Sequence, residues 1–156
     1  VQGLACGVYE PLDPALLPPV YVAFNDDASE PTEVIHNNLR DRFHRGEPAV
    51  IHAMAELAAL AAEARQAILD RDAKRLGRCI DRNFDLRRSI CRLAQPHVEM
   101  IETARRTGAT ASFTGSGGAI VGTYPDEACF DRLQTALSAL HCRVIRPRIA
   151  AQGSAN

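Results

Sequence analysis

The sequence has no tryptophan, and only 5% of its residues are aromatic. Proteins that bind single-stranded nucleic acid stack the bases on aromatic rings, so the sequence offers little material for such a surface. The formal net charge is -1, which gives a nucleic-acid partner no electrostatic support either. No apolar run approaches the roughly 20 residues that span a bilayer, so we expect no membrane association. A basic segment followed by an apolar core, the mark of a signal peptide, is also absent from the first residues.

Closely spaced cysteines are missing as well. No two of the five cysteines form a C-x-x-C pair, and their odd number argues against a disulfide framework or a zinc site. Isolated cysteines are typical of reducing compartments, so we predict a cytoplasmic protein. The five histidines are equally dispersed, which indicates surface or capping positions and predicts no metal ligands in this chain. These histidines are His36, His44, His52, His97 and His141.

The 156 residues, 46% of them hydrophobic, suit one globular domain with a real core. Residues 1–19 are dense in glycine and proline, which predicts a lead-in or linker from an earlier domain. We predict that the folded domain covers residues 20–150 and that residues 151–156 form a frayed tail. The first residue is valine rather than methionine, so we expect this chain to be a piece of a longer protein.

The hydrophobic periodicity predicts a strand, a block of helices, two strands around a glycine loop, a helix and a last strand. Four strands and a layer of helices indicate an α+β fold, a two-layer sandwich. The predicted strands are 20–24, 110–114, 119–124 and 142–149, and the predicted helices are 32–44, 48–68, 73–93, 96–107 and the segment through 130–140.

The glycine loop between the second and third predicted strands is the most informative stretch. Three glycines in four residues exceed what a two-residue hairpin turn needs. Glycines allow backbone N–H groups to approach a ligand, and successive exposed N–H groups form a nest that suits phosphate. On spacing alone, an ordinary glycine-rich hairpin is the simpler interpretation. The candidate ligand-binding residues are Gly115, Ser116, Gly117 and Gly118.

A second candidate is the polar segment Asn83–Arg88 within the predicted helix 73–93. Asn83 falls on an otherwise apolar stripe, so its amide must be hydrogen-bonded or border a cleft. One hypothesis is a sugar site, in which Asn83 binds a hydroxyl and Arg87 or Arg88 binds a carboxylate in a bidentate fashion. The other is a solvated helix face with local ion pairs, which the spacing alone favours.

Several segments, in one order, resemble a known family. Residues 111–124 (ASFTGSGGAIVGTY) resemble the third conserved motif of the GHMP kinases, a superfamily that includes galactokinase, homoserine kinase and mevalonate kinase. Many relatives have a longer glycine run there, from which Ser116 and Ala119 depart. Asn83–Arg88 (NFDLRR) resembles the glucuronokinase branch. Three further stretches do so too: residues 9–19 (YEPLDPALLPP), 53–67 and 98–108 (VEMIETARRTG). The resemblance thus runs over about residues 7–150.

This resemblance implies the C-terminal domain of a sugar-1-kinase, with a ferredoxin-like, mainly antiparallel four-stranded sheet. It implies that the loop 115–118 faces the triphosphate of ATP, and that Asn83, Arg87 and Arg88 face a sugar or uronic acid. In the family, an N-terminal domain of the same protein holds most of the ATP and the Mg²⁺ and supplies the catalytic base. This chain shows none of those motifs, so we expect no catalytic residue in it and no activity of the chain alone.

Two questions stay open at this point. Heptose-phosphate 1-kinases and fucokinases share parts of the pattern, so the resemblance does not decide which sugar is phosphorylated. The alternative function is a non-catalytic, stand-alone module that keeps the fold for ligand binding or dimerisation, with the helical block and the edge strands as its interface. Either function predicts an exposed apolar patch.

Overall fold

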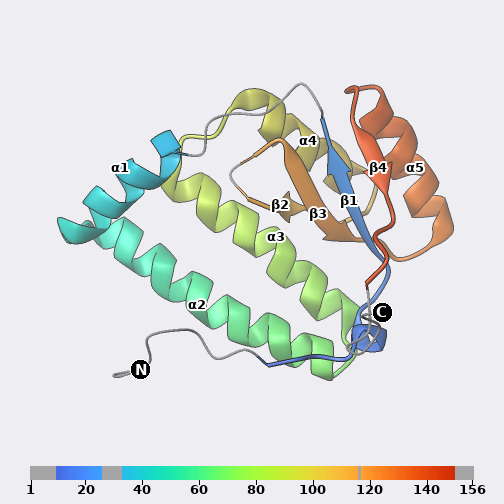
Figure 1. Ribbon diagram of the computed structural model, residues 1–156, viewed down its shortest axis with the longest axis horizontal. Helices are drawn as coiled ribbons and strands as arrows, with labels where there is room; N and C mark the ends of the chain where they lie inside the picture. Colours follow the sequence, from blue (N-terminus) through green and yellow to red (C-terminus); the bar gives the residue numbers. More distant parts are fainter. Residues whose placement is uncertain (1–9, 26–32, 116, 150–156) are drawn as a thin grey trace, which may run out of the picture.

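The computed structural model describes residues 10–25, 33–115 and 117–149, which form one sheet and a set of helices (Figure 1). The long connection from β1 to β2 contains four consecutive helices, and a single helix connects β3 to β4. In chain order the elements are a 3-10 turn (Pro14–Leu16), β1 (Val20–Phe24), α1 (Glu33–His44), α2 (Pro48–Leu69), α3 (Ala73–Ile90), α4 (Gln95–Arg106), β2 (Ser112–Phe113), β3 (Ala119–Thr123), α5 (Glu127–Ser138) and β4 (Arg143–Ile145).

Within these residues the four strands form one sheet in the order β2-β3-β1-β4, and every neighbouring pair is antiparallel. Val22 at the centre of β1 lies opposite Val121 on one side and Ile145 on the other. The split β-α-β arrangement, repeated twice with antiparallel pairing, is the ferredoxin-like topology. The predicted α+β class and antiparallel sheet are therefore confirmed.

The helices start and stop where the sequence supplies the appropriate residues. Asp72 and Asp126 cap α3 and α5 by accepting backbone N–H bonds, at 2.9 Å from Arg75 and 2.7 Å from Cys129. Pro48 occupies the first position of α2, where its missing N–H does no harm. Gly108 adopts a φ of 95° just after α4 and ends that helix.

Helices α4 and α5 cover one face of the sheet and build the main core. Tyr21 and Ala23 alternate inward on β1, and Ile120 does so on β3. Ile101 of α4 and Leu133 of α5 pack against them, and both are fully buried. Fully burying side chains of this size is worth about 1.5–3 kcal/mol each, so this layer accounts for much of the stability.

The backbone of Thr110 comes unusually close to Gly122 of β3. A Cβ added there would lie 1.7 Å from the carbonyl oxygen of Thr110 and 2.8 Å from the ring of Tyr21. This approach lets the Tyr21 hydroxyl donate a hydrogen bond to the same Thr110 carbonyl at 2.8 Å. The segment that leads into β2 is thus held against the core by a contact that only glycine permits.

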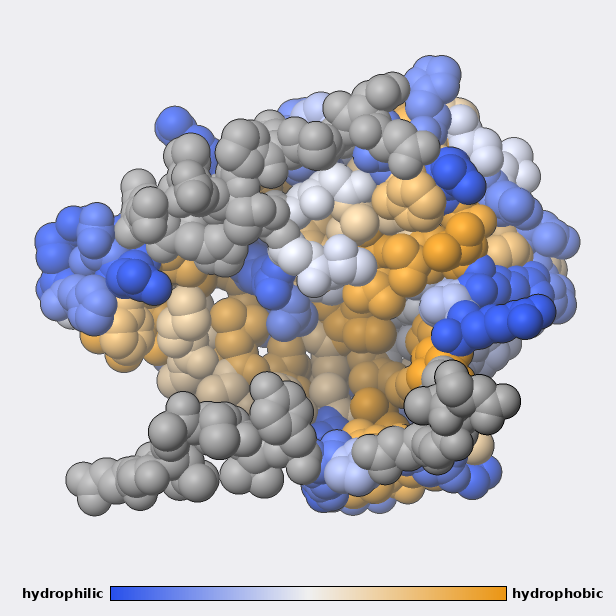
Figure 2. All heavy atoms as spheres, in the orientation of Figure 1, coloured by the Kyte–Doolittle hydropathy of each residue, from blue (hydrophilic) through white to orange (hydrophobic). Residues whose placement is uncertain are grey.

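Within the residues that the structure describes, the opposite face of the sheet is only partly covered. Val20, Val22 and Phe24 of β1 point to that face and are half-buried, and Ile145 of β4 is 43% exposed. Figure 2 shows apolar residues across the middle of this view, over the sheet and towards α2 and α3. Among the described residues, apolar side chains are therefore partly exposed on this face.

Helices α1, α2 and α3 form a second packing unit beside the sheet. Val50 and Ala53 of α2 pack against Ile90 of α3, with Leu39 of α1 at the edge of the cluster. Helix α2 lies on the far side of α3 from the sheet (Figure 1), so much of its alanine-rich surface stays exposed. None of the helices in the part of the chain that the structure describes is long and apolar enough to cross a membrane.

Some elements are shorter than the sequence predicts. Helix α3 ends at Ile90 rather than near residue 93, and β2 has two residues instead of five. Strand β4 ends at Ile145 because Pro147 follows and has no N–H to donate. Residues 1–9 and the predicted tail 151–156 lie outside the described residues, as does residue 150.

Candidate functional site: the glycine loop and helix α3

The candidate site is centred on the loop that joins β2 to β3. Thr114 N donates to the carbonyl of Ala119 at 3.2 Å and closes the loop. Gly117 and Gly118 have φ angles of 149° and 75°, in a region where residues with a Cβ are strained. The loop conformation therefore requires glycine at these two positions. Gly115 is exposed, and Ser116 lies outside the described residues.

Helix α3 runs beside β2, and its side chains form three hydrogen bonds with residues 111–115, the segment that contains β2. The side chains that form these bonds come from the polar segment around Asn83–Arg88 and the turn before it. Because β2 is an edge strand, two of these contacts give partners to backbone groups that face away from β3, and the third joins two side chains. The contacts are Ala111 N to Asp81 Oδ1 at 2.9 Å, Ser112 Oγ to Asn83 Oδ1 at 3.0 Å, and Arg87 Nη1 to Gly115 O at 2.8 Å.

The three predicted substrate residues therefore have different surroundings. Arg87 is half-buried and reaches the glycine loop itself. Asn83 lies beside β2, and its bond to the Ser112 hydroxyl explains how an amide is tolerated on this stripe. Arg88 points away to α4, where its Nη1 pairs with Glu102 Oε1 at 2.9 Å. The structure thus brings Arg87, and not Arg88, to the loop.

A half-buried arginine connects α3 and α4 to the segment that leads into β2. Arg105 of α4 donates to the backbone carbonyls of Asp81 and Ala111, at 2.7 and 3.2 Å, and to the carboxylate of Asp85 at 2.8 Å. Its guanidinium also lies 5.1 Å from the centroid of the Phe84 ring. A planar fork with five donors suits this task, because it can serve several acceptors at once.

Asp81 and Arg105 form an ion pair as well. Arg105 Nε lies 3.0 Å from Asp81 Oδ1, although that N–H is not aligned for a hydrogen bond. Burial raises the pKa of the Asp81 carboxyl, while the N–H of Ala111 and the Arg105 guanidinium oppose that rise. The pair joins α3, α4 and the start of β2 at one point.

His97 is a neighbour of the loop that the sequence prediction missed. It was expected at the surface or in a cap, but it is 4% exposed in the first turn of α4. A Cβ built on Gly117 would lie 2.3 Å from His97 Nδ1, so the imidazole is packed against the loop backbone. The available signal was its spacing, because His97, Ile101 and Ala104 lie on one helical face and all three are buried.

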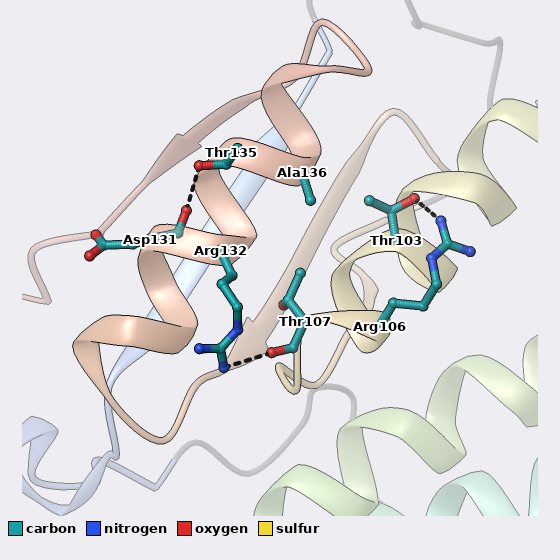
Figure 3. A pocket seen from close by; sticks show the side chains of 7 residues that line it. All are labelled: Thr103, Arg106, Thr107, Asp131, Arg132, Thr135 and Ala136. Carbon is teal, nitrogen blue, oxygen red and sulfur yellow. Dashed lines mark hydrogen bonds between the residues drawn. The ribbon is translucent and has the colours of Figure 1, made fainter.

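A separate hollow of about 550 Å³ lies between α4 and α5, away from the predicted residues (Figure 3). Arg132 Nη2 donates to the carbonyl of Thr107 there, and Arg106 Nη2 donates to the Thr103 hydroxyl. Both arginines already serve protein acceptors in this hollow. Among the residues that the structure describes, no cluster of three or more His, Cys, Asp or Glu side chains could hold a metal ion.

Comparison with known proteins identifies sequence relatives. The chain is 43% identical over 124 residues to "Probable glucuronokinase 2" of Arabidopsis thaliana, and 39% identical over 127 residues to "Glucuronokinase 1" of the same plant. These matches cover 77% and 79% of this chain. They cover 33% and 34% of the plant proteins, so the chain spans about a third of their length. No protein-family model matches the chain.

Solved structures show the same fold. L. major mevalonate kinase, solved with R-mevalonate, aligns with a TM-score of 0.73 over 85% of this chain and 44% of its own, at 20% identity. The Lin0012 protein of Listeria innocua aligns with a TM-score of 0.73 over 83% of this chain and 38% of its own, at 14% identity. The resemblance to the GHMP-family kinases is therefore confirmed. In sequence the chain is similar to glucuronokinases, and in fold it matches the C-terminal domain of the GHMP kinases.

We predict that the Arg105 contacts are important for stability. Replacing Arg105 with Met should lower the free energy of unfolding by about 2–3 kcal/mol, since it removes the cation paired with the Asp81 carboxylate and the donor to the backbone carbonyls of Asp81 and Ala111. Replacing Arg88 with Met removes an exposed ion pair and should cost less than about 1 kcal/mol. Urea unfolding of the chain followed by circular dichroism compares the two variants, and equal losses would contradict the role given to Arg105.

Proposed function

We propose that this chain is the phosphate-facing C-terminal half of an ATP-dependent kinase that phosphorylates the anomeric hydroxyl of a sugar, with glucuronate as the leading substrate. The observation that carries this proposal is the glycine loop, in which Gly117 and Gly118 adopt positive φ angles that favour glycine. The loop lies in a chain that is 39–43% identical to glucuronokinases. The relatives are kinases, which supports the reaction class, and their names support the uronic acid.

The loop fits the phosphates of a nucleotide. Gly115, Gly117 and Gly118 have no side chains, so a ligand can approach their backbone closely. The Arg87 guanidinium adds a positive charge at 2.8 Å from the Gly115 carbonyl oxygen. In phosphoryl transfer, positioning and charge stabilisation provide most of the catalysis. We propose Gly115, Ser116, Gly117 and Gly118 as the residues that face the ATP phosphates.

The sugar side of the site is proposed for α3. A planar guanidinium binds a carboxylate with two parallel hydrogen bonds, so we propose Arg87 rather than Arg88 as the partner of the uronate carboxylate. Arg88 is already paired with Glu102. The amide NH₂ of Asn83 would donate to a sugar hydroxyl, since its Oδ1 already accepts from Ser112.

The proposed reaction moves the γ-phosphoryl group of ATP to the C1 oxygen of the sugar. The O–P bond to ADP breaks, a new O–P bond forms at C1, and the hydroxyl proton leaves to a base. We propose that the part of the protein that precedes this domain supplies this base, most of the ATP site and the carboxylate for Mg²⁺, which would neutralise phosphate charge. The chain alone would then be inactive, and the reaction would occur in a cleft between two domains.

The open face of the sheet offers a surface for that missing part. Val22, Phe24 and Ile145 leave apolar area uncovered there, while about two thirds of the length of the relatives lies outside this chain. We propose that the N-terminal domain covers this face. The described cysteines Cys79, Cys91, Cys129 and Cys142 are all free thiols, which supports the proposal of a reducing, cytoplasmic location.

Other exposed groups suit the alternative of a non-catalytic module that dimerises. The exposed Ile51 and Leu69 on α2 and the uncovered edge of β4 would be its interface. A chain that forms a stable dimer and binds a ligand, while the full-length protein phosphorylates nothing, would favour this alternative.

The direct test of the proposed function is an activity assay. The full-length protein that contains this chain should convert glucuronate and ATP to glucuronate 1-phosphate and ADP, detected by ³¹P NMR. The 156-residue chain alone should show no turnover, and adding a separately expressed N-terminal domain should restore it. An intact protein that phosphorylates neither uronates nor neutral sugars would remove the kinase proposal.

The proposed carboxylate contact predicts a difference between neighbouring arginines. Replacing Arg87 with Ala should raise the KM for glucuronate by about tenfold or more, because a charge-assisted hydrogen bond is lost. The KM for the neutral sugar glucose should change much less. The matched variant Arg88→Ala should affect glucuronate less than Arg87→Ala does. Equal effects of Arg87→Ala on glucuronate and glucose would contradict the carboxylate contact.

A further inference from the structure

We propose that His97 is a positioning residue for the glycine loop: its imidazole holds Gly117 in the conformation that receives the phosphates of the nucleotide. This inference rests on the proposed nucleotide-binding function and adds to it a residue from outside the loop. His97 lies eighteen residues or more from every loop glycine in the sequence, so only the fold brings them together.

The contact between His97 and the loop is close. A Cβ added to Gly117 would meet three ring atoms of His97: Nδ1 at 2.3 Å, Cε1 at 2.7 Å and Cγ at 3.2 Å. The ring therefore occupies the space that a side chain at position 117 would need. Gly117 also has a φ of 149°, so both the backbone and the ring demand glycine there.

His97 itself has little freedom to move. It is 4% exposed, and it belongs to the first turn of α4, directly after Pro96, which has a fixed φ. Its ring stands edge-on to Phe113 at 6.1 Å between centroids, and Phe113 stands edge-on to Phe84 of α3 at 5.2 Å. A row of three rings thus connects α3, the last residue of β2 and α4.

The loop is held on its other side by α3. Arg87 Nη1 donates to the Gly115 carbonyl, two residues before the contact with His97. At the far end, Asn25 N donates to the Gly118 carbonyl at 3.1 Å. Three residues from distant parts of the sequence therefore contact the loop at Gly115, Gly117 and Gly118.

Such restraints matter because glycine loses more conformational freedom on ordering than any other residue. A loop that is ordered before the ligand arrives does not lose that entropy on binding, so its affinity is higher. His97 is buried beneath the backbone, and its effect would be on the loop rather than on the reacting atoms. It should therefore influence nucleotide binding and leave sugar binding unchanged.

The test uses two substitutions in the full-length protein. His97→Leu keeps a buried apolar side chain but removes the flat ring, and we expect it to raise the KM for ATP about fivefold. His97→Phe keeps a planar ring against Gly117 and Phe113, and it should stay within about twofold of wild type. The KM for glucuronate should change in neither variant. His52→Ala, at an exposed position on α2, is the control.

A second measurement does not depend on activity. Amide hydrogen exchange of residues 114–119, without nucleotide, should be about tenfold faster in His97→Leu than in wild type and unchanged in His97→Phe. Unchanged exchange and an unchanged KM for ATP in His97→Leu would overturn the inference, as would equal rises in both KM values. A wild-type protein without kinase activity would instead refute the proposed function, while the exchange measurement would still decide whether His97 orders the loop.

Discussion

The Arg105 guanidinium, bound to Asp81 and to the carbonyl of Ala111, is the contact on which the rest of the site depends. It fixes α4 against α3 and fixes both against the backbone that enters β2. From that point α3 and β2 run side by side, so that Asn83 meets Ser112 and Arg87 meets Gly115. The position of the glycine loop is therefore set by a helix and not only by its own two strands.

The packing of α3 beside β2 also protects one edge of the sheet. Strand β2 is an edge strand of two residues, and such an edge usually needs protection from unwanted pairing. Side chains of α3 provide that protection, because they bind polar groups of the segment that contains β2. On the other face of the sheet, the described residues leave the apolar side chains of β1 half-buried and Ile145 of β4 exposed.

Much of the fold could be predicted from local pattern. The run of β-formers at Val20–Phe24, the apolar stripes of the helices and the three loop glycines each determine a local conformation, and the structure agrees with them. The shorter β2 could not be predicted, because the Thr110 carbonyl accepts from the distant Tyr21 hydroxyl and the Thr123 N–H donates to the Thr110 hydroxyl, so regular pairing with β3 begins only at Ser112. His97 was misplaced for a similar reason: its burial depends on Gly117 and Phe113, which only the tertiary fold brings to it.

In the candidate site, too, the local sequence predicts some features and the tertiary fold decides the others. The sequence and its resemblance to a family identified the loop and the Asn83–Arg88 segment, but not which arginine faces the loop. Two adjacent residues on a helix point about 100° apart, so Arg87 reaches Gly115 while Arg88 reaches Glu102. The choice between them follows from the orientation of α3, which the Arg105 cluster fixes.

The central claim is that the loop 115–118 faces nucleotide phosphates in the intact protein. Hydrogen–deuterium exchange of the full-length protein, with and without a non-hydrolysable ATP analogue, tests it most directly. The account predicts that the analogue slows exchange of the peptide that covers residues 114–119 and leaves exchange in α2 unchanged. Protection elsewhere in the protein with no change in this peptide would contradict it.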